Sequence, residues 1–136
     1  MKISDAVQVI NAAMVADDTV LMEGLHGIGK SQIVQQFAKA NGFHLVELFL
    51  SHQEVGDLIG IPDTQINAKG EKITVWSCPV WLDRIKEMAD KRIKIIVFLD
   101  ELNRAPIDVR QSALQLVLER KIHEHTLPVV DGCRTM

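Results

Sequence analysis

The amino-acid sequence predicts an α/β fold with a mostly parallel sheet. Three observations indicate this fold: helical and extended segments alternate, a glycine-rich loop joins an apolar strand to an amphipathic helix, and one apolar run ends in two acidic residues. That run, residues 93–99, is typical of a parallel strand covered on both faces. With 136 residues, of which 47% are hydrophobic, the chain is expected to form one domain.

The first half is expected to contain two helices and two strands. Ser4 is the predicted N-cap of the first helix, Asp17 and Asp18 close it into a turn, and residues 20–22 follow as a short buried strand. The glycine-rich loop at 24–29 precedes a second helix that ends at Gly42, and residues 43–50 form the next strand. The apolar residues at helical spacing are Ala6, Val7, Ile10, Ala13 and Met14, then Ile33, Val34, Phe37 and Ala38.

The second half is less regular before residue 78. Residues 56–62 are expected to form a turn and residues 67–70 the tip of a hairpin, with a returning strand around Ile73 and Val75. Pro79 and Pro106 are each expected in the first turn of a helix. The predicted inward residues are Trp81, Leu82, Ile85, Met88 and Ala89 in the first of these helices, and Ala113, Leu114, Val117 and Leu118 in the second.

Composition excludes several classes of protein. The net charge of −3 and the 4% aromatic content argue against direct nucleic-acid binding, because neither a basic surface nor a base-stacking platform is indicated. No apolar run approaches the roughly 18 residues of a membrane span, and no signal-peptide pattern is present. Cys78 and Cys133 lack metal-binding spacing. We therefore expect a cytoplasmic protein that neither enters a membrane nor binds nucleic acid directly.

The glycine-rich loop matches the phosphate-binding pattern G-x-x-x-x-G-K-[ST] at every fixed position. Glycines let a loop turn its backbone N–H groups toward a diphosphate, and the following helix adds its N-terminal partial positive charge. Lys30 is expected to reach the β- and γ-phosphates, and the Ser31 hydroxyl to ligate Mg²⁺. The predicted nucleotide contacts are Gly24, Leu25, His26, Gly27, Ile28, Gly29, Lys30, Ser31 and Gln32.

Two alternatives compete with parts of this interpretation. A dinucleotide fingerprint would need a third glycine where Gln32 stands, and it has no place for a Lys-Ser pair, so we reject it. His26 occupies a variable position of the loop that more often points outward than toward a nucleotide.

Asp100 and Glu101 follow the apolar run at 93–99. The carboxyl edge of a parallel sheet is where ligands bind, and the phosphate loop lies at that edge. Asp100 is therefore expected to hold Mg²⁺ through its water shell, and Glu101 to polarise a water for attack on the γ-phosphate. A solvated helix cap is the alternative for an isolated acidic pair. Glu101 also favours hydrolysis over phosphoryl transfer to a metabolite.

These motifs resemble the AAA+ ATPases, specifically their MoxR-like and dynein-related branch. The resemblance rests on the loop at 24–31, on Gly56-Asp57-Leu58-Ile59-Gly60, on Cys78-Pro79-Val80-Trp81, and on Phe98-Leu99-Asp100-Glu101-Leu102-Asn103-Arg104-Ala105-Pro106. It implies a P-loop NTPase three-layer sandwich with a hairpin insert at about 61–76. It further implies ATP and Mg²⁺ as cofactors, with Glu101 and Lys30 catalytic and Ser31 and Asp100 at the metal. Ser51 would be the polar residue that restrains the glutamate, although an ordinary strand-end serine is the commoner case.

The resemblance also implies partners and an incomplete sheet. Members of the branch act as hexameric rings that remodel partner proteins or insert metals into them, in a chaperone-like manner. Their ATPase core continues past the position of Met136, so residues 1–136 are expected to form one truncated domain, incomplete at the C-terminus, with weak nucleotide binding and poor hydrolysis. Asn103 and Arg104 match the family string without an assignable role.

Two other functions and one other site remain open at this point. The chain could be a nucleotide-dependent interaction module that binds without turnover, or a small-metabolite kinase, for which the sequence offers neither lid nor acceptor site. His123 and His125 flank Glu124 and would share one side of an extended segment, as paired metal ligands do, although a polar hairpin is the commoner explanation.

Overall fold

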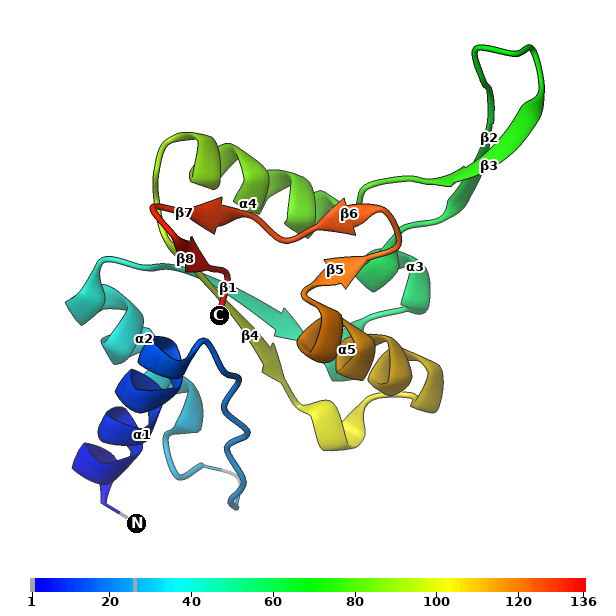
Figure 1. Cartoon of the computed structure of the whole chain (residues 1–136). Helices are drawn as coiled ribbons and strands as arrows, with labels where there is room; N and C mark the ends of the chain where they lie inside the picture. Colours follow the sequence, from blue (N-terminus) through cyan, green and yellow to red (C-terminus); the bar gives the residue numbers. More distant parts are fainter. Residues whose placement is uncertain (1, 26) are drawn as a thin grey trace.

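The computed structural model describes residues 2–25 and 27–136. Helices and strands are interspersed along the chain, as Figure 1 shows. In chain order they are α1 (Ile3–Ala16), α2 (Lys30–Asn41), β1 (His44–Phe49), the 3-10 turn η1 (Leu50–His52), α3 (Val55–Ile59), β2 (Pro62–Ile66), β3 (Lys72–Trp76), α4 (Val80–Asp90), β4 (Ile95–Asp100), the 3-10 turn η2 (Leu102–Arg104), α5 (Ile107–Glu119), β5 (Lys121–Ile122), β6 (His125–Thr126), β7 (Val129–Val130) and β8 (Cys133–Arg134).

The centre of the fold is a parallel pair of strands, β1 and β4. Their register runs from His44 opposite Ile95 to Phe49 opposite Asp100. Alternate side chains of β4 enter two different cores, because successive residues of a strand point to opposite faces. Ile95 packs with α3, α4 and α5 on one face, and Ile96 packs with α1 and α2 on the other. This arrangement confirms the predicted α/β fold with a parallel sheet.

The sheet explains why both acidic residues lie at an edge. Since the strands are parallel and in register, both end on the same side of the molecule, where Asp100 is the last residue of β4. The apolar run before it supplies core contacts on both faces, and Ile95 and Ile96 are 2% and 6% exposed. Several residues near this carboxyl edge, including Asp100 and Glu101, are only partly buried, which leaves polar groups there accessible.

The far edge of β4 is largely unpaired. The Met136 N–H donates to the carbonyl of Ile95 (3.1 Å), and the Val97 N–H donates to the carbonyl of Met136 (2.8 Å). This is the bonding pattern of a parallel bridge. Further along the same edge, the Val97 carbonyl and the Leu99 N–H have no hydrogen-bond partner among the residues that the structure describes.

Four sequence predictions are wrong in detail. α1 begins at Ile3 with Lys2 as its N-cap, so Ser4 lies inside the helix. Residues 20–22 form no strand, because no described strand pairs with them, and Leu21 is 69% exposed. Residues 55–59 form the short helix α3 where a turn was expected at 56–62.

The fourth wrong prediction concerns the inward face of α5. Leu114 and Leu118 are 48% and 82% exposed, although both were expected in the core. The buried residues of this helix are Val109, Ala113 and Leu116. The buried residues lie at helical spacing on one face of α5. Leu114 and Leu118 lie on a neighbouring apolar stripe that no described segment covers.

β2 and β3 form an antiparallel hairpin, called the arm here (residues 62–76), which projects from the body in Figure 1. Every residue of β2 is exposed, and so are the first three of β3. Two shorter hairpins, β5–β6 and β7–β8, follow α5. None of the helices in the described ranges combines the length and apolar character needed to cross a bilayer.

Candidate functional site

The glycine-rich loop leads directly into the N-terminus of α2. Gly27 and Gly29 have φ angles of 78° and 87°, which glycine adopts without steric cost, and Gly29 is the N-cap of the helix. The first amides of a helix have no partner within it, so they point outward from its N-terminus together with the positive end of the helix dipole. A helix N-terminus of this kind favours an anion, so phosphate binding by this loop stays a prediction of the motif.

Lys30 lies across the loop. Its ammonium group donates to the carbonyls of Gly24 (2.8 Å) and Leu25 (3.0 Å). These contacts bring the ammonium group back to Gly24 and Leu25, the first residues of the loop. A cation at this place suits the phosphate-binding part predicted for Lys30.

The remaining predicted nucleotide contacts are mostly exposed. Leu25 and Ile28 are 81% and 55% exposed, and Gln32 lies on the outer side of the first turn of α2. His26 lies outside the described residues. The side chains of Leu25 and Ile28 are thus largely accessible to solvent.

Ser31 and Asp100 meet although 69 positions separate them in the sequence. The Ser31 hydroxyl donates to Asp100 Oδ2 at 3.1 Å, and the other carboxylate oxygen accepts from the N–H of Glu101 at 2.8 Å. α2 supplies the serine from its first turn, and β4 supplies the aspartate from its last residue. The fold therefore brings the phosphate loop and the acidic pair to a single place.

Glu101 is held in a turn immediately after β4. Its φ angle is 56°, in the left-handed region, and its side chain is 26% exposed. The Ser51 hydroxyl donates to the Glu101 carboxylate, and Arg104 Nη1 lies 3.9 Å from the other carboxylate oxygen. Ser51 follows β1 and Glu101 follows β4, so the parallel register brings both to the same edge. The serine and the arginine together fix where the carboxylate points.

Asn103 and Arg104, which follow the acidic pair, differ in the contacts that they make. Arg104 forms an ion pair with Glu101. The spacing of three residues between them is the feature of the sequence that could have predicted this contact. Asn103 makes no hydrogen bond to the rest of the described chain. The sequence assigned no role to either residue, and the structure shows a contact for Arg104 alone of the two.

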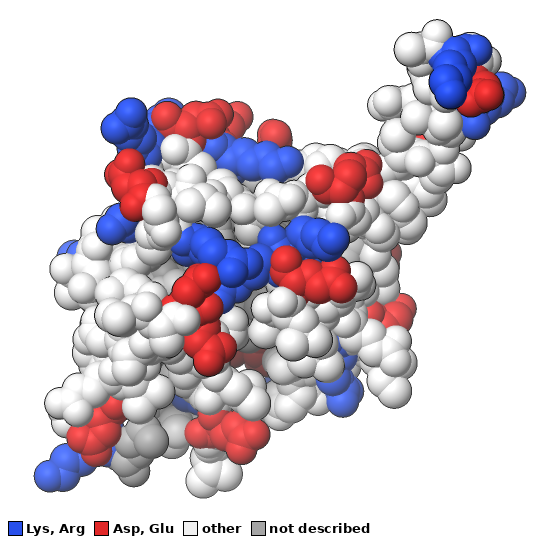
Figure 2. Space-filling view, in the orientation of Figure 1, with Lys and Arg blue, Asp and Glu red and all other residues white. Residues whose placement is uncertain are grey.

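Surface charge around the site is mixed. Figure 2 shows Lys and Arg interspersed with Asp and Glu over the visible face, without a broad field of one sign. Within the described ranges, no group of three or more His, Cys, Asp or Glu residues is placed to hold a metal ion, so His123 and His125 lack a third such ligand. Both histidines instead contact Trp76, which the sequence did not foresee.

Comparison with known families and structures completes the description. The family model described as AAA domain (dynein-related subfamily) matches residues 19–133, which include the loop, both acidic residues and the arm. No solved structure matches the chain.

Proposed function

The chain belongs to the dynein-related subfamily of AAA domains, and we propose that its carboxyl-edge site binds ATP with Mg²⁺ and hydrolyses it. Membership supports an ATP-dependent activity in general, as the resemblance in the sequence implied. The residues proposed for each step are those that the fold brings to the edge: Lys30, Ser31, Asp100 and Glu101.

The contact between Ser31 and Asp100 carries the proposal. Mg²⁺ binds oxygen ligands at about 2.0–2.1 Å in an octahedron, whose adjacent ligands are therefore about 2.9 Å apart. The two side-chain oxygens are 3.1 Å apart, so this donor set fits a magnesium site, directly or through coordinated water. A bound Mg²⁺ would neutralise charge on the phosphate oxygens.

The other residues act on the nucleotide and on water. Lys30 places its charge inside the loop, where the β- and γ-phosphates would lie, and the first amides of α2 add hydrogen-bond donors. Glu101 accepts a proton from, or orients, the attacking water. Ser51 occupies one carboxylate oxygen of Glu101 and therefore restrains that residue until the hydrogen bond is exchanged.

We further propose that hydrolysis drives remodelling of a protein partner, in the manner of the MoxR-like branch, by subunits assembled in a homohexamer. The resemblance described above is the main support. The uncovered apolar stripe on α5, with Ile107, Leu114 and Leu118 each at least 48% exposed, is consistent with a subunit contact.

The test combines nucleotide binding with phosphate release. Glu101→Gln should keep Mg·ATP affinity within about twofold, while steady-state phosphate release falls by about 100-fold or more, the usual effect of losing a general base. Glu119→Gln, which makes the same change at an exposed residue of α5, is the matched control and should leave both quantities unchanged.

Two results would contradict parts of the proposal. Phosphate release that persists in Glu101→Gln would remove Glu101 from the mechanism. Tight Mg·ATP binding without any turnover in the parent protein would instead support a nucleotide-dependent interaction module.

A further inference from the structure

Trp76, the last residue of β3, is contacted by three consecutive residues of the β5–β6 hairpin. The rings of Trp76 and His123 are stacked, with centroids 3.7 Å apart and planes 12° from parallel. The Trp76 N–H donates to Glu124 Oε1 at 3.1 Å. His125 Nε2 lies 2.8 Å from the Trp76 carbonyl, to which it donates. The ring, amide and carbonyl of one residue are thus all engaged by one turn.

The backbone of the turn is consistent with a specific need for the His123 side chain. His123 has a φ angle of 49°, a left-handed conformation that is unfavourable for a non-glycine residue. The turn of the β7–β8 hairpin also begins with a non-glycine residue of positive φ, Asp131 at 50°. Asp131 makes no hydrogen bond or ion pair within the described chain, whereas the His123 ring covers Trp76. Only the first turn offsets its backbone cost with a side-chain contact.

Charge adds to these contacts. Hydrogen bonds from backbone amides, first its own and then that of Trp76, lower the pKa of the Glu124 carboxyl, and the charges of His125 and His123 add smaller contributions in the same direction. The carboxylate therefore stays ionised at neutral pH and accepts the Trp76 N–H as an anion, which makes the hydrogen bond stronger.

The two residues that flank the arm, Ile61 and Ser77, are hydrogen-bonded to each other. The N–H of Ile61 donates to the Ser77 hydroxyl (3.0 Å), and the N–H of Ser77 donates to the Ile61 carbonyl (2.9 Å). At Gly60 a Cβ atom would lie only 1.9 Å from the Ser77 carbonyl oxygen, so the two ends of the arm meet in backbone contact. The arm beyond them is exposed, and its direction depends on contacts at its base.

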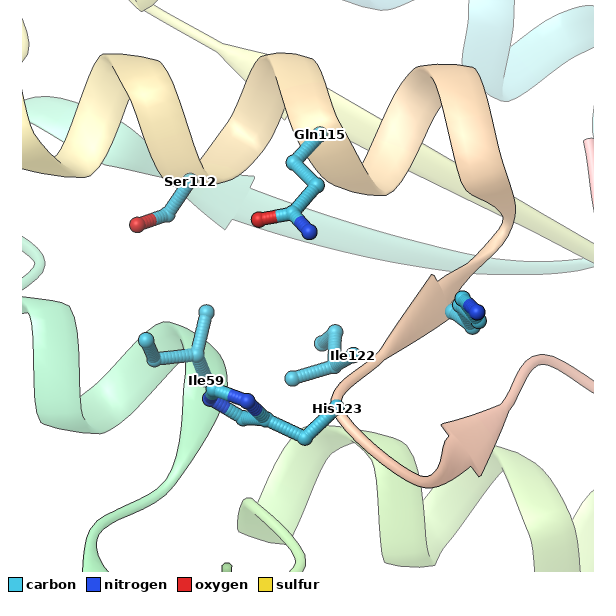
Figure 3. Close-up of a pocket in the computed structure, with 6 residues that line it drawn as sticks. Ile59, Ser112, Gln115, Ile122 and His123 are labelled. Atoms are coloured by element: carbon cyan, nitrogen blue, oxygen red, sulfur yellow. The ribbon is translucent and has the colours of Figure 1, made fainter.

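The hairpin that holds the arm continues directly from α5. A small cavity of about 20 Å³ lies between α3, α5 and β5, and in Figure 3 Ile59 and His123 lie on the side opposite Ser112 and Gln115. Such a volume accommodates about one water molecule, so the joint between these elements is nearly filled. α5 in turn begins just after the segment that carries Asp100 and Glu101.

We propose that the turn formed by His123, Glu124 and His125 is a clasp that fixes the direction of the arm on α5, so that the arm and the end of α5 move as one body. The clasp gives a use to the His-Glu-His sequence that needs no metal. It does not depend on nucleotide binding, and its test uses the protein without nucleotide.

The test measures motion of the arm by NMR in the full chain. His123→Gly removes the stacking ring and at the same time relieves the positive φ, so the hairpin should remain folded. Backbone order parameters over 62–76 should fall from about 0.85 to about 0.6 or lower, while those of α4 and α5 stay unchanged. Residual dipolar couplings of the arm should shrink relative to those of the body.

Asp131→Gly is the control, because it replaces another positive-φ residue at the start of a two-residue hairpin turn without touching Trp76. It should leave the order parameters and couplings of the arm at parent values. Glu124→Ala, which keeps the turn residue His123, should also increase arm motion. Parent-like order parameters in both His123→Gly and Glu124→Ala would overturn the clasp.

Discussion

The carboxyl-edge site and the clasp are built in similar ways but differ in how far the sequence reveals them. Both join residues from distant parts of the chain: Ser31 meets Asp100 at the edge, and Trp76 meets His123 at the clasp. Both also contain a non-glycine residue with positive φ whose side chain is engaged, Glu101 and His123. The edge site was predicted residue by residue, whereas the clasp was not.

The difference lies in what each region asks of its residues. Phosphate binding requires a fixed local order of glycines, lysine and serine, so the chemistry is written in consecutive positions. The clasp requires only that a particular turn reach a particular tryptophan. Ring stacking and hydrogen bonds to a backbone amide or carbonyl can each be made by many residue types. The residues that make these contacts therefore form no recognisable pattern in the sequence.

The largest effect is expected for a substitution at the carboxyl-edge site that should leave the clasp unchanged. Lys30→Ala removes the cation inside the loop and should weaken Mg·ATP binding by about 10- to 100-fold, the range for a lost hydrogen bond to a charged group. The measurement is a titration with a fluorescent ATP analogue. Lys39→Ala, on the exposed side of the same helix, is the control and should bind like the parent. Order parameters of the arm should not change in either variant.

That prediction would fail if Lys30→Ala bound nucleotide within twofold of the parent. In that case the helix N-terminus and loop amides would suffice, and the bonds of Lys30 to the carbonyls of Gly24 and Leu25 would be structural.

A smaller effect is expected at the restraint on the proposed base. Ser51→Ala frees one oxygen of Glu101 and should raise basal phosphate release by about threefold to tenfold, as expected for the loss of one hydrogen bond to a carboxylate. Ser51→Thr keeps the hydroxyl and should behave like the parent, and Ser4→Ala serves as an unrelated serine control. Nucleotide affinity should remain unchanged in all three. Slower release in Ser51→Ala would mean that the serine positions Glu101 for reaction.

The smallest effect is expected at the clasp and depends on pH. Because the pKa of Glu124 is lowered in the folded protein, its contribution to stability is present above the ordinary glutamate pKa and is lost as pH falls through the lower, folded-state value. Glu124→Gln should therefore lower Tm slightly at neutral pH, and the difference from the parent should shrink as the pH falls below the ordinary glutamate pKa.

Thermal unfolding of both proteins at several pH values provides the measurement. Glu119→Gln is the control, since the side-chain contact of that exposed residue, with Gln115 on its own helix, lies away from the clasp. A Tm difference that stays unchanged however far the pH is lowered below the ordinary glutamate pKa would show that the charge of Glu124 contributes nothing to the clasp.

Local patterns account for most of what the sequence predicted. Local sequence specifies the secondary structure in three places: the apolar run that forms β4, the glycines of the loop, and the prolines before α4 and α5. Long-range context accounts for the failures: Leu114 and Leu118 are apolar yet exposed because no described segment covers them, and residues 20–22 have strand-like composition without a pairing strand. The contacts of Trp76 depend on where two hairpins meet, which no local pattern encodes.

The unpaired edge of β4 has a consequence for how molecules of this protein meet one another. Proteins commonly protect exposed strand edges with charge, proline or a covering segment, because an open ladder recruits foreign strands. Between Val97 and Leu99 the unpaired backbone groups lie in strand β4, which has no charged side chain before Asp100. Concentrated solutions should therefore begin to associate through this edge, and a single lysine introduced there would be the simplest protection against it.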